Sequence, residues 1–378
     1  MGRIVLVGNG WHPPLFRAEV NALAGHSEIF HPRIVSVSQS NKNLENISGA
    51  ALVDMAIKNT STIKKCVDIS ENDIADSVVS WSDKNLPEGS FSVRARKLGK
   101  GVSDLSRRKI ETLVGALLVS DENPVDLSNP EHEIIVILGG PEEGSIHTDE
   151  TVKSEPVIVW GLKDSILTSG SYVGESPTDR PYFKPVTLDP RLARLMISLS
   201  QKDKKTTTII DPFCGTGGIV IEASLLGYNV LASDLDPRMV EGTRKNISHL
   251  GLENTKAEVS DAGEIDKIWN KQSSCSFVFD PPYGRSAWKS GEGLDLVISA
   301  LSAANRICPT ATICTMMPTT ADVLDGFLSN DQIVMGKRWQ EVQDLIREQG
   351  WKINLAIPIK VHKSLARIMI VCHPADSR

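Results

Sequence analysis

Asp280, Pro281, Pro282 and Tyr283 are the residues whose types and spacing most clearly indicate chemistry. They follow an apolar run, 277–279, that is typical of a buried strand. Two consecutive prolines cannot continue a strand ladder, so a carboxylate, a carbonyl and a ring should gather where the strand ends. Open α/β sheets bind ligands at that edge. The group suits a planar base with an exocyclic amine, whose two N–H groups the carboxylate and carbonyl accept while the ring stacks on the base. Alone, the string could equally be an Asp-Pro turn.

A glycine-rich segment upstream favours the chemical interpretation. Residues 208–220 are typical of a strand, a turn containing Gly215 and Gly217, and a helix. Glycines let the backbone approach a ligand closely, and a helix N-terminus favours anionic groups. The segment is not a P-loop, because no Lys-Ser/Thr pair follows the glycines. It also lacks the third glycine of the dinucleotide fingerprint.

Acidic residues stand at the predicted ends of successive strands. Asp211 ends the strand before the glycine turn, Asp234 ends the next strand, and Asp261 closes a later apolar segment. An acid about 20 positions after a glycine turn suits a ribose diol. A lone glycine pair is often only a tight turn, but the ordered set of acids before Asp280 is much harder to attribute to chance.

This ordered set resembles the S-adenosylmethionine-dependent amino-methyltransferases. The resemblance implies an α/β, Rossmann-like catalytic domain. It implies that the cofactor is held by Asp211, Phe213, Gly215, Thr216, Gly217, Asp234, Asp261 and Ala262. In this family Asp234 would hold the ribose and Asp261 the adenine. The catalytic residues would be Asp280, Pro281, Pro282 and Tyr283.

A narrower resemblance concerns the segment before the glycine turn. Residues 180–185 and 188–194 look like the first segment of tRNA guanosine N2-methyltransferases. Within these, the turn D-P-F-C-G-T-G-G and the motif D-P-P-Y-G are most similar to archaeal-type enzymes that act on guanosine 10 of tRNA. The chemistry this implies is orientation: Asp280 and the Pro281 carbonyl would each accept an N–H of the guanine amine, Tyr283 would stack on the base, and the base would have to be flipped out of the tRNA.

The N-terminal half resembles a smaller α+β region that contains a THUMP domain, an RNA-binding module. A predicted strand that ends in a basic turn, 91–99, precedes an amphipathic helix, 105–119, and a strand, 133–138. Net charge is −6, yet the basic residues cluster between 94 and 109. Such a run is often only a solvated face, but the resemblance favours contacts with RNA phosphates. The predicted RNA-binding residues are Arg94, Arg96, Lys97, Lys100, Arg107 and Arg108.

The length of the chain and the positions of its glycine, proline and serine residues predict the domain organisation. We expect an N-terminal ferredoxin-like domain at 1–50, a THUMP domain at 51–160, a linker at 161–179 and the catalytic domain at 180–378. The linker range is rich in glycine and serine. A composition of 40% hydrophobic and 23% charged residues is ordinary for globular domains.

The remaining sequence features exclude several classes of protein. No apolar run reaches the length of a signal peptide or a membrane span, so we expect a cytoplasmic protein. The six cysteines are scattered without a C-x-x-C pair, which predicts reduced thiols and no metal site. Cys214, inside the glycine turn, is expected to be a packing residue rather than a nucleophile.

Alternative functions stay open at this level. A D-P-P-Y string also serves enzymes that methylate DNA adenine, ribosomal RNA or another tRNA position, such as 6. A non-catalytic RNA-binding subunit is a further alternative. The resemblance gives tRNA as the partner and a monomer as the expected state. Some relatives work with a small activator protein, and the number of methyl groups added is open.

Overall fold

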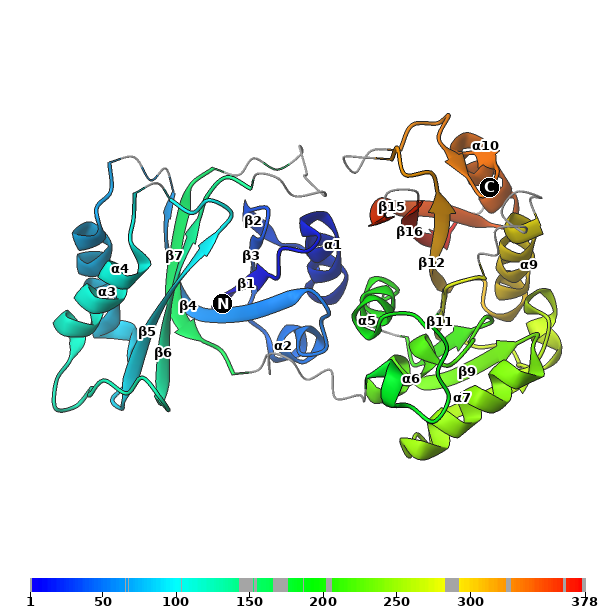
Figure 1. Ribbon diagram of the computed structural model, residues 1–378, viewed down its shortest axis with the longest axis horizontal. Helices are drawn as coiled ribbons and strands as arrows, with labels where there is room; N and C mark the ends of the chain where they lie inside the picture. The colour runs from blue at the N-terminus through cyan, green and yellow to red at the C-terminus, as the bar shows by residue number, and fades with distance from the viewer. Residues whose placement is uncertain are drawn as a thin grey trace. The chain divides into compact units, whose positions relative to one another are not determined.

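The structure is a computed structural model with two compact units (Figure 1). The first unit consists of residues 1–48 and 52–169, and the second of residues 49–51 and 170–378. The structure describes residues 2–64, 66, 68–102, 104–142, 152, 155–165, 176–185, 187–201, 206–282, 292–323, 328–362 and 365–375. Within them, no helix is both long and apolar enough to cross a membrane.

One sheet runs through the whole first unit. Its order is β2-β3-β1-β4-β7-β6-β5, and β5 with β6 is its parallel pair. The strands are β1 (Arg3–Gly8), β2 (Glu28–His31), β3 (Ile34–Ser38), β4 (Val53–Lys64), β5 (Phe91–Leu98), β6 (His132–Gly139) and β7 (Val157–Lys163). The sheet continues across residue 50, where a domain boundary was expected, and β7 extends into the range expected to be linker. The division of this half into two domains, one of them THUMP, stays a prediction.

Four helices flank this sheet in two pairs. They are α1 (Pro13–Ala24), α2 (Asn41–Ile47), α3 (Glu71–Asn85) and α4 (Arg107–Leu118). Figure 1 shows α3 and α4 together beside β5 and β6, whereas α1 and α2 lie beside β1 and β3. The apolar stripe predicted for α4 is largely confirmed, because Ile110 and Val114 are buried, but Leu117 is exposed.

The second unit is doubly wound, as predicted. Its main sheet has the order β10-β9-β8-β11-β12-β16-β15. Strands β8 to β12 are parallel, and β16 is antiparallel to both of its neighbours. The strands are β8 (Thr208–Asp211), β9 (Asn229–Asp234), β10 (Thr255–Val259), β11 (Cys275–Phe279), β12 (Thr312–Thr319), β15 (Trp351–His362) and β16 (Leu365–Pro374), with the short β13 (Ile333–Val334) and β14 (Lys337–Arg338) continuing from β12.

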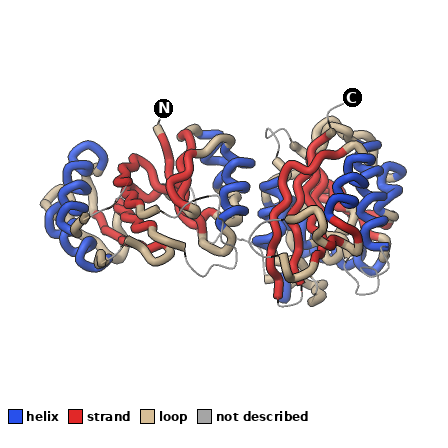
Figure 2. Tube along the Cα trace, turned by 90° about the horizontal axis from the view of Figure 1, so that it is seen from above, coloured by secondary structure: helices blue, strands red, loops and turns tan. Residues whose placement is uncertain are grey.

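Helices cover both faces of this sheet (Figure 2). They are α5 (Pro190–Leu199), α6 (Gly218–Leu225), α7 (Pro237–His249), α9 (Glu292–Ile307) and α10 (Trp339–Glu348), with the 3-10 helices η1 (Pro177–Asp179) and η2 (Ala262–Lys267). A closing hairpin of β15 and β16 completes the sheet, and β16 occupies an interior position between β12 and β15.

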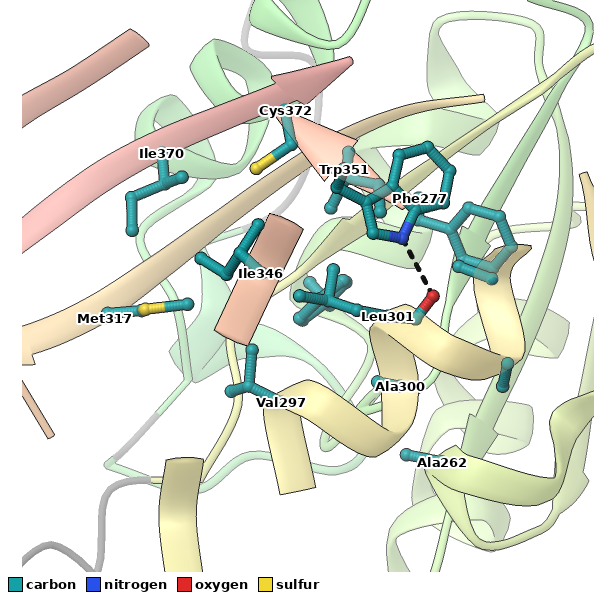
Figure 3. Packing of buried hydrophobic residues seen from close by; sticks show 14 of the residues in the cluster. Ala262, Phe277, Val297, Ala300, Leu301, Met317, Ile346, Trp351, Ile370 and Cys372 are labelled. Atoms are coloured by element: carbon teal, nitrogen blue, oxygen red, sulfur yellow. Dashed lines mark hydrogen bonds between the residues drawn. The ribbon is translucent and has the colours of Figure 1, made fainter. Parts of the chain in front are cut away.

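The core of the second unit packs α9 and α10 against the sheet. Figure 3 shows Trp351 and Phe277 in this core, together with Leu301 of α9. The Trp351 indole Nε1–H donates to the Leu301 carbonyl at 2.9 Å, so the buried indole keeps its hydrogen bond. This packing fixes the closing hairpin against the parallel strands, whose ends carry the predicted site.

Candidate functional site

The predicted acids lie along one edge of the second sheet. Asp211 and Asp234 end β8 and β9, Asp280 follows β11, and Asp261 follows β10. Since these strands are parallel neighbours, their carboxyl ends share an edge. The chain winds outward from β8 to β10 and then returns to β11 on the other side of β8, so the topological switch point lies between β8 and β11. Asp211 and Asp280 flank that point.

The glycine turn is built by backbone geometry and one buried acid. Asp211 is 1% exposed, and its Oδ1 accepts the Phe213 N–H at 3.0 Å. Gly215 and Gly217 have φ values of +51° and +89°, a region that favours glycine, and α6 begins directly afterwards. The Cys214 thiol is buried, and burial raises its pKa, in keeping with a packing role. The predicted strand, turn and helix are confirmed.

Asp234 ties the turn to the next strand. One of its carboxylate oxygens accepts the Gly215 N–H at 3.0 Å, and the other accepts the Asp236 N–H at 2.9 Å. The Thr243 hydroxyl of α7 donates to the Gly215 carbonyl at 2.8 Å. Two separate elements, β9 and α7, therefore hold the Gly215 backbone in place, and the carboxylate of Asp234 lies directly against the turn.

Negative charge accumulates around Asp211. Burial raises its pKa well above the ordinary value, and the charges of Asp234 and Asp280 raise it further, while the hydrogen bond from Phe213 acts in the opposite sense. Carboxylates that disfavour each other's ionisation are stabilised by a cation placed among them. A cation bound near Asp211 would therefore favour its ionised form.

Asp261 extends this edge by one strand. Its carboxylate caps η2 by accepting the Gly263 N–H at 2.7 Å, and Ala262 is buried behind it. The neighbouring Ser260 N–H donates to the Asp234 carbonyl at 3.1 Å. Asp261 thus lies beside Asp234, as the order of the strands requires.

The predicted catalytic corner contains an unpredicted cation. Asp280 is partly buried, and its Oδ2 lies 3.5 Å from Nη1 of Arg367 on β16. Pro281 is buried and Pro282 is exposed, while Tyr283 lies outside the described residues. The rings of Phe213 and Phe279 are 5.5 Å apart, so the glycine turn contacts the strand that leads to Asp280. Sequence reasoning gave no signal for Arg367, because only strand pairing brings it to this corner.

The segment before α5 is fastened to the cofactor turn. The Asn246 side chain accepts the Tyr182 N–H at 2.9 Å and donates to the carbonyls of Tyr182 and Thr216 at 2.8 and 2.9 Å. The hydroxyls of Thr187 and Thr216 are 2.9 Å apart. Sequence reasoning missed Asn246 and Thr187 as positioning residues. Thr216, predicted to contact the cofactor, is buried and connects the two segments.

The predicted RNA-binding residues lie on the surface of the first unit. Arg94, Arg96, Lys97, Lys100, Arg107 and Arg108 are all exposed, on β5, on α4 and between them. The Arg96 guanidinium pairs with Asp54 at 3.2 Å, and Arg94 donates to the Leu127 carbonyl at 2.9 Å. Exposed contacts of this kind are weak, so they do not hold these two side chains firmly.

Comparison with known proteins identifies relatives of this chain. Residues 177–345 match the family described as RMKL-like, methyltransferase domain. The tRNA (guanine(10)-N2)-dimethyltransferase of Methanothermobacter thermautotrophicus is 31% identical over 296 residues, which cover 78% of this chain and 75% of that protein. A protein of the same name from Pyrococcus abyssi is 27% identical over 271 residues, 71% of this chain and 75% of that one. The crystal structure of TrmN from Thermus thermophilus aligns with a TM-score of 0.49 at 19% identity, over 99% of this chain and 100% of that chain.

Proposed function

The chain belongs to the family of tRNA (guanine(10)-N2)-dimethyltransferases, and from that premise we propose that its Asp280 corner transfers methyl groups to the exocyclic N2 amine of guanosine 10 in tRNA. The enzyme is S-adenosylmethionine-dependent, as is general for this class. The observation that carries the proposal is the position of Asp280, which directly follows β11 at the switch point beside the glycine turn.

The residues at the edge of the sheet fit the cofactor. S-adenosylmethionine supplies, when bound, an electrophilic methyl group on a positively charged sulfonium. The acidic side chains of Asp211, Asp234 and Asp280 gather at this edge, and such a cation bound among them would favour their ionised forms. We assign the ribose hydroxyls to Asp234 and the adenine to Asp261 and Ala262. Phe213, Gly215, Thr216 and Gly217 would line the same turn.

Asp280 and the Pro281 carbonyl would orient the amine. The lone pair of a guanine amine is delocalised into the ring, so the amine is a poor nucleophile until it pyramidalises. Two acceptors that take its two N–H groups turn the lone pair toward the methyl group. Orientation of this kind contributes roughly 7–11 kcal/mol to a reaction barrier. The negative Asp280 also stabilises the positive charge that develops on nitrogen, and it can take the proton released after the N–C bond has formed.

The substrate base must leave its stack to reach this corner. A guanosine in a stem or junction is covered by its neighbours, so we infer that it is flipped out. Tyr283 is proposed to stack on the flipped base, worth about 1–3 kcal/mol for such contacts. The exposed basic residues of β5 and α4 would hold the tRNA backbone without reading its sequence. A THUMP domain in the first unit, a monomeric state and a cytoplasmic location are parts of this proposal, and an activator protein is a possible addition.

In vitro methylation followed by nuclease mapping tests the proposal. An unmodified tRNA transcript is incubated with the cofactor, digested and analysed by mass spectrometry for the nucleotide, the atom and the methyl count. We expect N2-methylguanosine or N2-dimethylguanosine at position 10. Asp280→Asn and Asp280→Ala should lower the rate by at least 100-fold, on the order of the loss of one positioned transition-state group.

A matched control removes a carboxylate elsewhere in the unit. Asp331 is exposed and lies 3.8 Å from Arg338, so Asp331→Asn should keep wild-type activity. Methylation at another tRNA position, such as 6, or of ribosomal RNA or DNA adenine instead, would replace the proposal with that alternative. Full activity of both Asp280 variants would mean that another residue orients the amine. Complete inactivity of the wild type would favour a non-catalytic RNA-binding subunit.

A further inference from the structure

We propose that Arg367 donates a hydrogen bond to O6 of the target guanine and thereby makes this corner specific for guanine. The inference rests on the proposed function, because it assumes that guanine is held by Asp280. Arg367 would be a specificity residue that contacts the base, in addition to the residues of the D-P-P-Y motif.

The position of Arg367 follows from strand direction. It is near the start of β16, which is antiparallel to β12, and it pairs with Pro318 near the end of β12. An antiparallel strand begins at the edge where its parallel neighbours end, so Arg367 reaches the edge that carries Asp280. The result is an Nη1 to Oδ2 distance of 3.5 Å, with the side chains of Arg367 and Asp280 only 22% and 17% exposed.

The chemistry of the pair matches the edge of guanine that bears the amine. Along that edge guanine presents the O6 acceptor, then the N1–H donor, then the N2 amine donors. The corner presents a donor in Arg367 next to the acceptor carboxylate of Asp280, and the acceptor carbonyl of Pro281 follows Asp280 in the chain. When Asp280 accepts N1–H together with one N–H of the amine, and the Pro281 carbonyl accepts the other N–H of the amine, the guanidinium beside Asp280 would be placed on the side of O6. Adenine presents an amine at that position, so its N–H donors would face the N–H donors of Arg367.

A guanidinium can hold the carboxylate and the base together. Its five N–H groups form a planar fork, so one group can face Asp280 while another faces O6. Arginine is a frequent donor to guanine O6, which it contacts together with N7 in the major groove of DNA. A lysine would supply charge at a single point and could not span both acceptors in one plane.

An atomic substitution in the substrate tests the contact. Two tRNAs are compared, one with guanosine and one with 6-thioguanosine at the methylated position. The 6-thio base keeps N1–H and the N2 amine but replaces O6 with a weak acceptor. We measure kcat/KM on both tRNAs for wild type, Arg367→Ala and Arg367→Lys. The ratio of the two values for each protein isolates the interaction between residue 367 and O6.

The proposal predicts a change in that ratio. Wild type should prefer guanosine by roughly 10- to 100-fold, the range for a charged contact to a base edge. Arg367→Ala should lower the rate on guanosine but bring the ratio close to one. Arg367→Lys should retain an intermediate ratio. If Arg367→Ala yields no measurable product, the ratio of Arg367→Lys decides, because a value equal to wild type would overturn the proposal.

A purely positioning role gives a different result. If Arg367 only orients Asp280, each variant lowers kcat/KM on both tRNAs by the same factor. The ratio of the two kcat/KM values then stays at the wild-type value, which would refute the contact with O6. Arg347→Ala, at an exposed arginine paired with Asp344 at 3.2 Å, is the control and should keep both rates. Failure of the proposed function would look different again, since wild type would then not methylate N2 of either tRNA.

Discussion

Glu222 connects two arginines inside the second unit, and its removal gives a sharp test of the structure. Its Oε2 accepts the Arg194 Nε–H at 2.6 Å, and its Oε1 lies 3.9 Å from Nη2 of Arg180. The side chains of Glu222, Arg180 and Arg194 are 1%, 1% and 9% exposed. Glu222 lies on α6, directly after the glycine turn, so the triad fastens the segment before α5 to the helix that follows the cofactor turn.

Glu222→Gln should be strongly destabilising although it keeps the shape of the side chain. A neutral amide removes the negative charge that Glu222 presents to the buried guanidinium groups of Arg180 and Arg194. Removing one partner of a buried ion pair costs roughly 3–5 kcal/mol of unfolding free energy. For a unit of this size, each kcal/mol lowers the melting temperature by about 2–4 °C, so we expect a decrease of roughly 6–20 °C.

Calorimetry of the full chain measures this effect. The transition of the second unit is identified as the one that S-adenosylmethionine raises, because a ligand stabilises the unit that binds it. The control is Glu241→Gln, since Glu241 forms an exposed i,i+4 pair with Lys245 at 3.9 Å. That pair should contribute less than about 1 kcal/mol. A Glu222→Gln protein that melts within the range of this control would show that the triad does not depend on the carboxylate charge.

Three further substitutions test other parts of the structure. Burial lowers the pKa of His31 to about 4, so between pH 6.5 and 4 only the unfolded chain takes up the proton. The first unit should therefore lose up to about 3 kcal/mol of unfolding free energy as the pH falls through this range. Urea titrations at each pH should show a smaller loss for His31→Gln. For Asp211 the stability changes with pH in the opposite direction, because burial raises the pKa of this side chain. Wild type should lose stability relative to Asp211→Asn as the pH rises above 3.8. Calorimetry should show that the variant binds S-adenosylmethionine more weakly. In Gly242→Ala the new Cβ would lie 2.0 Å from a ring carbon of Tyr182, so denaturation should show a loss of about 1–3 kcal/mol, and unchanged stability would mean that the ring moves aside freely.

The sequence alone was sufficient to predict the parallel strands of the second unit that carry the candidate site. Short apolar runs that end in an acid predicted β8, β9 and β11, because a buried parallel strand needs continuous apolar residues and its end must turn into solvent. The neighbouring positions of Asp211, Asp234 and Asp261 then followed from chain connectivity, since crossovers place successive strands side by side, whereas β11 returns to the other side of β8. In this part of the chain, the local sequence pattern and the topology of the sheet predict the same strands.

Local pattern failed where long-range pairing decides the structure. The 12-residue β4 pairs with both β1 and β7, yet its second half, Asn59–Lys64, is polar and gives no strand signal by itself. This second half pairs with β7, which sets its register, whereas β1 pairs with the first half. In the same way, nothing near Tyr182 indicates that the Asn246 side chain holds its backbone, because the two are joined only when α7 packs beside the turn.

Arg367 shows why a catalytic corner cannot be read completely from a motif. The parallel strands can supply acceptors at their carboxyl ends, because carboxylates and carbonyls follow each strand there. They cannot easily supply a cation that faces those acceptors from the side. An inserted antiparallel strand can, since β16 begins at the edge where β12 and β11 end, and its early residue Arg367 is carried to Asp280. The closing hairpin therefore does more than complete the sheet: its direction places a donor beside the acceptors, which is the arrangement that the edge of guanine requires.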